Sequence, residues 1–138
     1  MAADKSSKSV LFVCLGNICR SPMAEGIFKH LVKDRSDTSD WLIESCGTAR
    51  YHVGEQPDDR TLSTLEKHGI KNFRSTVRQL AKDDFSRFQW IFVFDDENKR
   101  NVDHKKPASS DSNINMIRRY DTEKDGWSYP TSYRPLLS

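Results

Sequence analysis

Short apolar runs alternate with segments of helical periodicity along most of the chain. Continuous apolar residues at positions 10–13 and 90–94 predict two buried strands, because a strand covered on both faces is apolar at successive positions. Residues 41–45, which follow a polar linker, predict another strand, and the weak alternation over 113–117 predicts one more. The pattern therefore predicts strands spread from the start of the chain to its C-terminal part.

Helical periodicity occupies the intervals between these strands. Apolar residues recur at helical spacing from Met23 to Leu31, and Ser21 and Pro22 suit the N-cap and the first helical position. Further helices are predicted at residues 57–69, 81–88 and 97–103. Strands separated by helices imply right-handed crossovers, and hence an α/β fold with a parallel sheet.

Composition narrows the class of protein. A chain of 138 residues forms one domain, residues 1–138, with a single core. Lys and Arg number 22 against 20 Asp and Glu, so the net charge indicates no particular partner, and no basic stripe indicates nucleic-acid binding. The polar N-terminus lacks the apolar core of a signal peptide, and no apolar run is long enough to span a membrane. Three cysteines without a secretory signal indicate the reducing cytoplasm.

The loop between the first strand and the first helix carries the candidate chemistry. Cys14 opens the loop at the end of the strand, and Arg20 closes it. Gly16 and Asn17 tolerate left-handed backbone conformations, so the chain can curl tightly there. The backbone N–H groups of such a loop, at a helix N-terminus, bind a tetrahedral oxyanion. The predicted phosphate-binding residues are Leu15, Gly16, Asn17, Ile18, Cys19, Arg20 and Ser21.

Cys14 is the candidate nucleophile. A free thiol titrates near about 8.5, but a thiol at a helix N-terminus beside an arginine has a lowered pKa. Ser21 can donate a hydrogen bond to the resulting thiolate, and the planar guanidinium of Arg20 can hold two phosphate oxygens. These features predict a thiolate that attacks phosphorus and forms a phosphocysteine, which water then hydrolyses. The alternative is that Cys14 is a small buried apolar residue at a strand end.

The segment 13–25, VCLGNICRSPMAE, resembles the signature of the low-molecular-weight protein tyrosine phosphatases. The resemblance fades after Lys106, and before that it continues through KHGI, RQL, DDF and FDDEN at 67–70, 78–80, 83–85 and 94–98. It implies a four-stranded parallel sheet flanked by helices in a three-layer sandwich, and cofactor-free hydrolysis of aryl phosphate esters. The implied partners are phosphotyrosine proteins or small aryl phosphates, with inorganic phosphate as product.

The resemblance also assigns roles to single residues. Cys14 corresponds to the nucleophile and Arg20 to the phosphate ligand. Asn17 and Ser21 correspond to organisers of the loop. Cys19 matches a second thiol, which in this family can form a protective disulfide with the nucleophile.

Other residues keep two interpretations. By the same resemblance Tyr51, after the second strand, stacks on the phosphotyrosine ring, and an exposed loop tyrosine is the equal alternative. Asp95, at the end of a core strand, either supports the phosphate loop or caps the next helix. Cys46 is the remaining thiol and no histidine cluster accompanies it, so no metal site is predicted. The loop lacks the Gly-Lys-Ser/Thr ending of a nucleotide-binding loop.

The C-terminal segment departs from the family pattern. In the family an aspartate in a late Asp-Pro loop protonates the leaving group, and this chain contains no Asp-Pro dipeptide. Residues 121–138 hold two prolines, a glycine and no helical period, which indicates a divergent or truncated C-terminus in place of a final helix. The acids there are Asp121, Glu123 and Asp125. Asp125 lies nearest the expected position, and a solvated turn residue is the alternative for each.

These observations leave two functions. The first is a cysteine-dependent protein tyrosine phosphatase or acid phosphatase, weakened by the missing general acid. The second is a phosphate- or phosphotyrosine-binding module that keeps the loop without efficient turnover. Thiol-based arsenate reduction on the same loop needs relay thiols, and Cys46 is poorly placed in the sequence to act as one.

Overall fold

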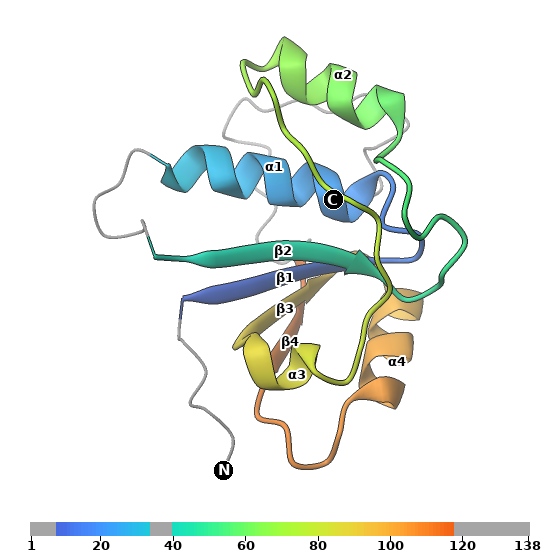
Figure 1. The fold of residues 1–138 in the computed structure, drawn as a ribbon. Helices are drawn as coiled ribbons and strands as arrows, with labels where there is room; N and C mark the ends of the chain where they lie inside the picture. Colours follow the sequence, from blue (N-terminus) through green and yellow to red (C-terminus); the bar gives the residue numbers. More distant parts are fainter. Residues whose placement is uncertain (1–7, 34–39, 118–138) are drawn as a thin grey trace.

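The computed structural model describes residues 8–33 and 40–117. Within them, four strands form one parallel sheet in the order β2–β1–β3–β4 (Figure 1). The strands are β1 (Ser9–Cys14), β2 (Leu42–Gly47), β3 (Trp90–Val93) and β4 (Asn113–Met116). This arrangement confirms the predicted α/β fold with a four-stranded parallel sheet. Each strand begins and ends within two residues of its predicted range.

Strand β1 lies between two neighbours in the sheet. All six of its residues are buried, because β2 and β3 pair with its edges and side chains from helices cover both of its faces. The register places Cys14 beside Gly47, and Val13 beside both Cys46 and Val93. The carboxyl ends of these strands therefore meet at one edge, which is where open parallel sheets bind their ligands.

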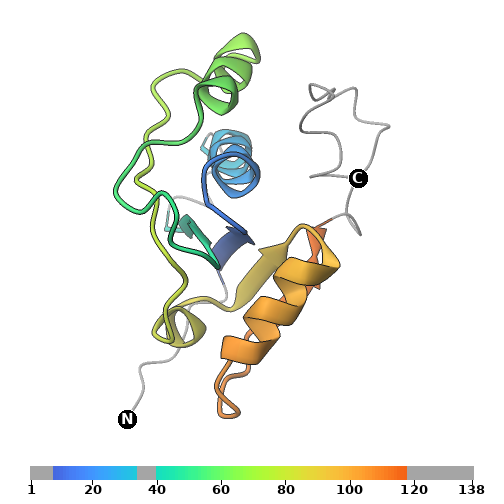
Figure 2. The same ribbon diagram turned by 90° about the vertical axis from the view of Figure 1, so that its right-hand side faces the viewer.

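The described helices are α1 (Arg20–Val32), α2 (Asp59–Lys67), α3 (Asp84–Arg87) and α4 (Asp96–Lys105). Helix α1 packs on one face of the sheet and carries α2 on its outer side, whereas α3 and α4 lie against the opposite face (Figure 2). Each face has its own core, one containing Phe12 and Met23 and the other Leu11 and Phe85. The prediction of a single core was wrong, because the sheet divides the buried side chains between its two faces. None of these described helices is long and apolar enough to cross a membrane.

Helix α1 begins earlier than the sequence predicts. Its N-cap is Cys19 and its first residue is Arg20, so Ser21 lies inside the helix and Pro22 is its third residue. The prediction that Ser21 caps the helix was wrong, because its hydroxyl lies 3.1 Å from Cys14 Sγ and serves the loop instead. Proline is still accommodated, since the N–H groups of the first turn have no partner within the helix.

The other helices begin and end near their predicted positions. Asp58 caps α2 by accepting a hydrogen bond from a first-turn backbone N–H at 2.7 Å. Gly69, with a φ of +84°, follows the end of α2 and turns the chain away, as the sequence predicts. Helix α3 is shorter than the predicted 81–88, and α4 is longer than the predicted 97–103.

Candidate active site

The loop from β1 to α1 folds back over the sulfur of Cys14. The backbone N–H of Asn17 donates to Cys14 Sγ at 3.2 Å, and Ser21 Oγ lies 3.1 Å from the same atom. Asn17 adopts a left-handed conformation with a φ of +58°, whereas Gly16 does not. The predicted curl therefore occurs at one of the two residues suggested for it. Cys14 is almost completely buried beneath this loop.

Carbonyl groups of the loop accept hydrogen bonds from neighbouring segments of the chain. Those of Cys14, Leu15 and Ile18 accept hydrogen bonds, at 2.7 to 2.9 Å, from backbone N–H groups of residues 48–49 and of Asp58. Across a planar trans peptide, the N–H that follows a carbonyl points in the opposite direction. The N–H groups in this part of the loop are therefore turned away from the supporting segments, as an anion cradle requires.

Arg20 is oriented by Asp95, and both interpretations of that aspartate are confirmed. Its Oδ1 accepts a hydrogen bond from the backbone N–H of Asn98 at 2.7 Å and so caps α4. Its Oδ2 accepts from Arg20 Nη1 at 2.5 Å. Burial acts to raise the pKa of Asp95, but these hydrogen bonds from Asn98 and Arg20 outweigh it, and the pKa is lowered. The guanidinium at the start of α1 therefore has a charged partner that fixes its position.

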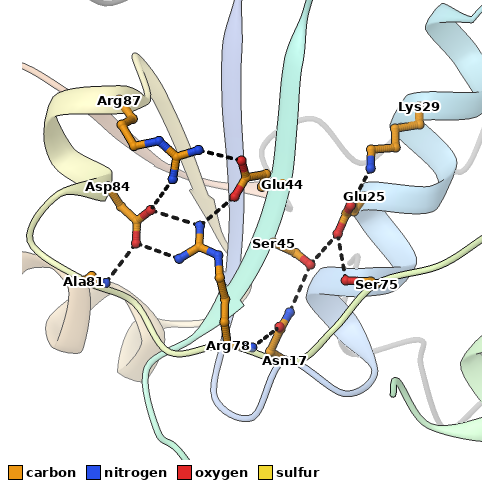
Figure 3. A network of polar contacts seen from close by, with 10 residues as sticks. All are labelled: Asn17, Glu25, Lys29, Glu44, Ser45, Ser75, Arg78, Ala81, Asp84 and Arg87. Atoms are coloured by element: carbon orange, nitrogen blue, oxygen red, sulfur yellow. Dashed lines mark hydrogen bonds and ion pairs between the residues drawn. The ribbon is translucent and has the colours of Figure 1, made fainter. Parts of the chain in front are cut away.

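Asn17 is locked in place by its side chain as well as by its backbone (Figure 3). Its Nδ2 donates to Ser21 Oγ at 2.7 Å and to Ser45 Oγ at 3.0 Å. Its Oδ1 accepts from the backbone N–H of Arg78 at 3.1 Å. These contacts join the loop to α1, to β2 and to the segment before α3. The left-handed residue that shapes the loop is thus held from three directions.

A buried carboxylate continues this network. Glu25 Oε1 accepts from Ser45 Oγ at 2.5 Å and from Ser75 Oγ at 3.3 Å, and its Oε2 accepts from Lys29 Nζ at 2.7 Å. Sequence reasoning did not assign Glu25 or Ser45 to the site. The available signal was the position of Glu25 at the end of segment 13–25, which resembles the family signature.

Arg78 anchors the outer side of the network (Figure 3). Its guanidinium binds both oxygens of Asp84, at 2.9 and 3.0 Å, and Glu44 Oε1 at 3.0 Å. Arg87 binds the other oxygen of Glu44 at 2.6 Å. Burial acts to lower the pKa of Arg78, but the hydrogen bonds and charge of Asp84 outweigh it, and the pKa is raised. The residue whose N–H holds Asn17 is therefore itself fixed to β2 and α3.

Gly47 is a further site residue that sequence reasoning missed. A Cβ atom at this position would lie 2.7 Å from Leu15 O and 3.0 Å from Asn17 N, both of which are backbone atoms. No side chain fits between the end of β2 and the loop. Only the register of β1 with β2, which pairs Gly47 with Cys14, shows why a glycine stands here.

The three thiols lie in different surroundings and none forms a disulfide. Cys19 is half-buried, and burial, together with the nearby Cys14, raises its pKa. Burial also raises the pKa of Cys46. Cys46 packs in the core beneath α3 and α4, whereas Cys14 packs in the core beneath α1. The sheet therefore separates these two thiols, which speaks against Cys46 as a relay thiol.

The rim of the site is formed in part by the loop after β2. Tyr51 is 73% exposed. Its neighbour His52 lies close enough to Gly16 that a Cβ there would be 3.8 Å from its ring. Asp121, Glu123 and Asp125, the candidate acids of the sequence, lie outside the described residues.

Comparisons with known proteins agree with this geometry. The family model described as "Low molecular weight phosphotyrosine protein phosphatase" matches residues 9–133. The mouse protein of that name is 42% identical over 124 residues, which cover 88% of this chain and 78% of the relative. A product-state mimic structure of a protein tyrosine phosphatase from Entamoeba histolytica is 32% identical, with a TM-score of 0.80 over 94% of this chain and 82% of that chain. A Drosophila arginine phosphatase is 35% identical, with a TM-score of 0.76 over 91% and 82%.

The fold and the loop at its carboxyl edge define an α/β protein whose candidate site is the loop between β1 and α1. The chain belongs to the low molecular weight phosphotyrosine protein phosphatase family, a family of hydrolases. The family match reaches residue 133, further than Lys106, where the resemblance of short motifs fades.

Proposed function

We propose that this chain hydrolyses phosphotyrosine in proteins, and small aryl phosphates, through a phosphocysteine formed on Cys14. One observation carries the proposal: Cys14 Sγ lies at the N-terminus of α1, 3.2 Å from the backbone N of Asn17 and 3.1 Å from Ser21 Oγ. The backbone N–H of Asn17 donates to the sulfur, and the N-terminus of α1 faces it. Arg20, oriented by Asp95, supplies the positive charge that a phosphate ester needs.

The hydroxyl of Ser21 can serve the thiol and the thiolate in turn. Ser21 Oγ accepts from Asn17 Nδ2 and lies 3.1 Å from Cys14 Sγ and 3.2 Å from Cys46 O. A hydroxyl has one hydrogen, so it donates to only one of these two acceptors. Beside a neutral thiol it donates to Cys46 O, and beside a thiolate it turns to sulfur. Rotation about one C–O bond thus stabilises the charge without movement of the loop.

The reaction proceeds in two displacements. The thiolate of Cys14 attacks phosphorus, the P–S bond forms, and the P–O bond to the aryl group breaks and leaves a phenolate to be protonated. Water then attacks the phosphocysteine, which releases inorganic phosphate and restores the thiolate. Arg20 and the N–H groups of the loop bind the phosphoryl oxygens in both steps. These residues supply the nucleophile and the positive charge, so the steps need no cofactor.

The leaving group also needs a proton as the P–O bond breaks. We assign this protonation to Asp125, the acid that lies nearest the position expected from the family. Because the chain has no Asp-Pro dipeptide, we propose that this step is impaired. The loss of a general acid typically costs about 10²–10⁴-fold in rate. The same feature favours the second candidate function, a module that binds phosphate or phosphotyrosine with little turnover.

The loop after β2 supplies the proposed contact with the substrate ring. Tyr51 is exposed, and the adjacent His52 lies against Gly16, which places this segment at the rim of the phosphate loop. An aromatic side chain there can stack on the phosphotyrosine ring. A nucleophile that must remain a thiol suits a reducing compartment, so we propose the cytoplasm as the place of action.

The proposal is tested by varying the leaving group. We expect p-nitrophenyl phosphate, whose phenolate leaves without protonation, to be hydrolysed well, and a phosphotyrosine peptide about 10²-fold more slowly relative to it. Cys14→Ser should abolish both reactions and retain phosphate binding in calorimetry. Asp125→Asn should slow the peptide alone, with Asp121→Asn as the matched control.

Four outcomes would change the proposal. Turnover by Cys14→Ser would remove Cys14 as nucleophile. Equal, efficient cleavage of both substrates would show an effective general acid. Phosphate binding by the unmodified chain without turnover of either substrate would establish the binding module. Faster cleavage of a phosphoarginine peptide would move the substrate class toward that named for the Drosophila structure.

A further inference from the structure

A basic groove lies at the end of α1 away from the phosphate loop. It opens between the second half of α1 and residues 69–74, which follow α2, and has a volume of about 560 Å³. Five of its lining residues have basic side chains: Lys29, His30, Lys33, Lys71 and Arg74. None of the described residues that line it is an aspartate or a glutamate. We use "basic groove" for this set of residues.

The wall of the basic groove is built into the fold. Ile70 is buried in the core beneath α1, and its N–H donates to the last turn of α2 at 2.9 Å. Phe73 packs against the same core. Asn72, with a φ of +62°, turns the chain between these two anchors. Lys71 and Arg74 are exposed beside them. The positive charges are thus presented by a segment that is already ordered.

Most of the charge in the basic groove is uncompensated. Lys29 is paired with the buried Glu25, and its Nζ lies 6.0 Å from the centre of the Phe73 ring. In the part of the chain that the structure describes, Lys33, Lys71 and Arg74 form no ion pair. A groove of one charge sign concentrates the field and raises the local concentration of oppositely charged ligands. The chain as a whole carries a net charge of only +2, so positive charge is more concentrated in the basic groove than over the rest of the chain.

We propose that the basic groove docks an acidic segment of the phosphoprotein substrate; this rests on the proposed function. Helix α1 connects the two places directly, since it begins at Arg20 in the phosphate loop and ends beside Lys33. At about 1.5 Å per residue the separation along the helix is roughly 20 Å. An extended peptide covers that distance with about six residues. Acidic residues six or more positions from the phosphotyrosine therefore reach the groove.

The shape of the basic groove favours a peptide over other polyanions. It is a shallow, open groove whose volume accommodates a few side chains of an extended segment. Its described lining residues carry two rings, His30 on α1 and Phe73, which packs against the core, so a row of stacking platforms for bases is not present. An extended peptide segment that carries carboxylates matches the positive charge and the shape of the basic groove.

The test uses three phosphotyrosine peptides that differ in one block. One is short, one carries four glutamates beginning seven residues from the phosphotyrosine, and one carries four glutamines there. We expect kcat/KM to be roughly tenfold higher for the glutamate peptide than for the glutamine peptide, through a lower KM at unchanged kcat. In 1 M salt, where the Debye length is about 3 Å, the advantage should disappear.

The groove variant is Lys33→Glu/Lys71→Glu, which spares Lys29 because that residue supports Glu25. Its matched control is Arg100→Glu/Lys106→Glu, with the same change in net charge on and just after α4, across the sheet. The groove variant should lose the preference for the glutamate peptide and keep the unmodified rate on p-nitrophenyl phosphate, whereas the control should retain both. Equal cleavage of the glutamate and glutamine peptides by the unmodified chain, or an intact preference in the groove variant, would overturn the proposal.

A binding measurement separates docking from catalysis. In the Cys14→Ser variant, fluorescence anisotropy of the unphosphorylated glutamate peptide should show binding that Lys33→Glu/Lys71→Glu abolishes. This binding does not depend on how efficient the chain is as an enzyme. If the peptide does not bind, the docking proposal is wrong, whereas hydrolysis of p-nitrophenyl phosphate would still support the proposed function. Groove-dependent binding of phosphatidylserine vesicles or of single-stranded DNA, without binding of the peptide, would assign the groove to that ligand and reject ours.

Discussion

The two ends of helix α1 contrast in how they use polar residues. At its start, Asn17, Ser21 and Glu25 are buried, and each has several hydrogen-bond partners at defined distances. At its other end, Lys33 faces solvent beside Lys71 and has no ion-pair partner within the described chain. A site that performs chemistry must hold its atoms in place, because small displacements cost large factors in rate. A site that attracts a charged segment needs charge and access rather than exact distances.

The contrast implies that small changes near the phosphate loop have large effects, even outside the signature motif. Gly47→Ala should lower kcat/KM for p-nitrophenyl phosphate by about 10²-fold, because its Cβ would displace the backbone of the loop. The matched control is Gly16→Ala, whose Cβ meets its nearest neighbours at 3.7 and 3.8 Å. We expect thermal unfolding to shift in Gly47→Ala and to change little in Gly16→Ala. An equal effect of both would contradict the close approach.

A second pair of variants separates backbone conformation from hydrogen bonding at Asn17. Asn17→Ala removes three side-chain hydrogen bonds and places a Cβ-bearing residue without local polar contacts at a φ of +58°. We expect the free energy of unfolding to fall by about 3 kcal/mol. Asn17→Gly loses the same hydrogen bonds without the strain and should recover about 1 kcal/mol of this. Denaturant unfolding measures both. Full recovery in Asn17→Gly would show that the hydrogen bonds contribute nothing.

The smallest effect concerns the protective disulfide. Peroxide should oxidise Cys14 to a sulfenic acid, and the thiolate of Cys19 then attacks that sulfur. The S–S bond forms as the S–O bond breaks, and the hydroxide that leaves takes up a proton from solvent to become water. Because burial raises the pKa of Cys19, its thiolate is scarce at pH 7 and increases with pH. Disulfide formation should therefore accelerate between pH 7 and pH 8.5, by up to roughly tenfold per unit. Recovery of activity with dithiothreitol measures it.

Cys19→Ser should lose this recovery after peroxide, and Cys46→Ser should behave as the unmodified chain. A rate of disulfide formation that does not depend on pH would contradict the role of the buried Cys19 thiol. Recovery in Cys19→Ser equal to that of the unmodified chain would remove the disulfide altogether.

The pattern of apolar and polar residues predicted the strands and the tight loop after β1. It did not predict all of the side chains that hold this loop in place. The two continuous apolar runs became the central strands β1 and β3, because a strand covered on both faces is apolar at successive positions. The weaker patterns at 41–45 and 113–117 became the edge strands β2 and β4. Ser21 was placed as a helix cap, since its side chain suits that position in isolation. In the folded chain the nearby sulfur of Cys14 and the side chain of Asn17 use the same hydroxyl. Tertiary contacts decided which of the two local possibilities is realised.

The sequence by itself determined the α/β fold class, the position of Cys14 at a strand end and its spacing to Arg20, because these depend on neighbours along the chain. The tertiary structure alone showed that Gly47 approaches the loop backbone and that Glu25 supports Asn17 through Ser45. It also brought Lys33 and Lys71 to one groove. Those relations join residues that are 20 or more positions apart, and only strand register and helix packing bring them together.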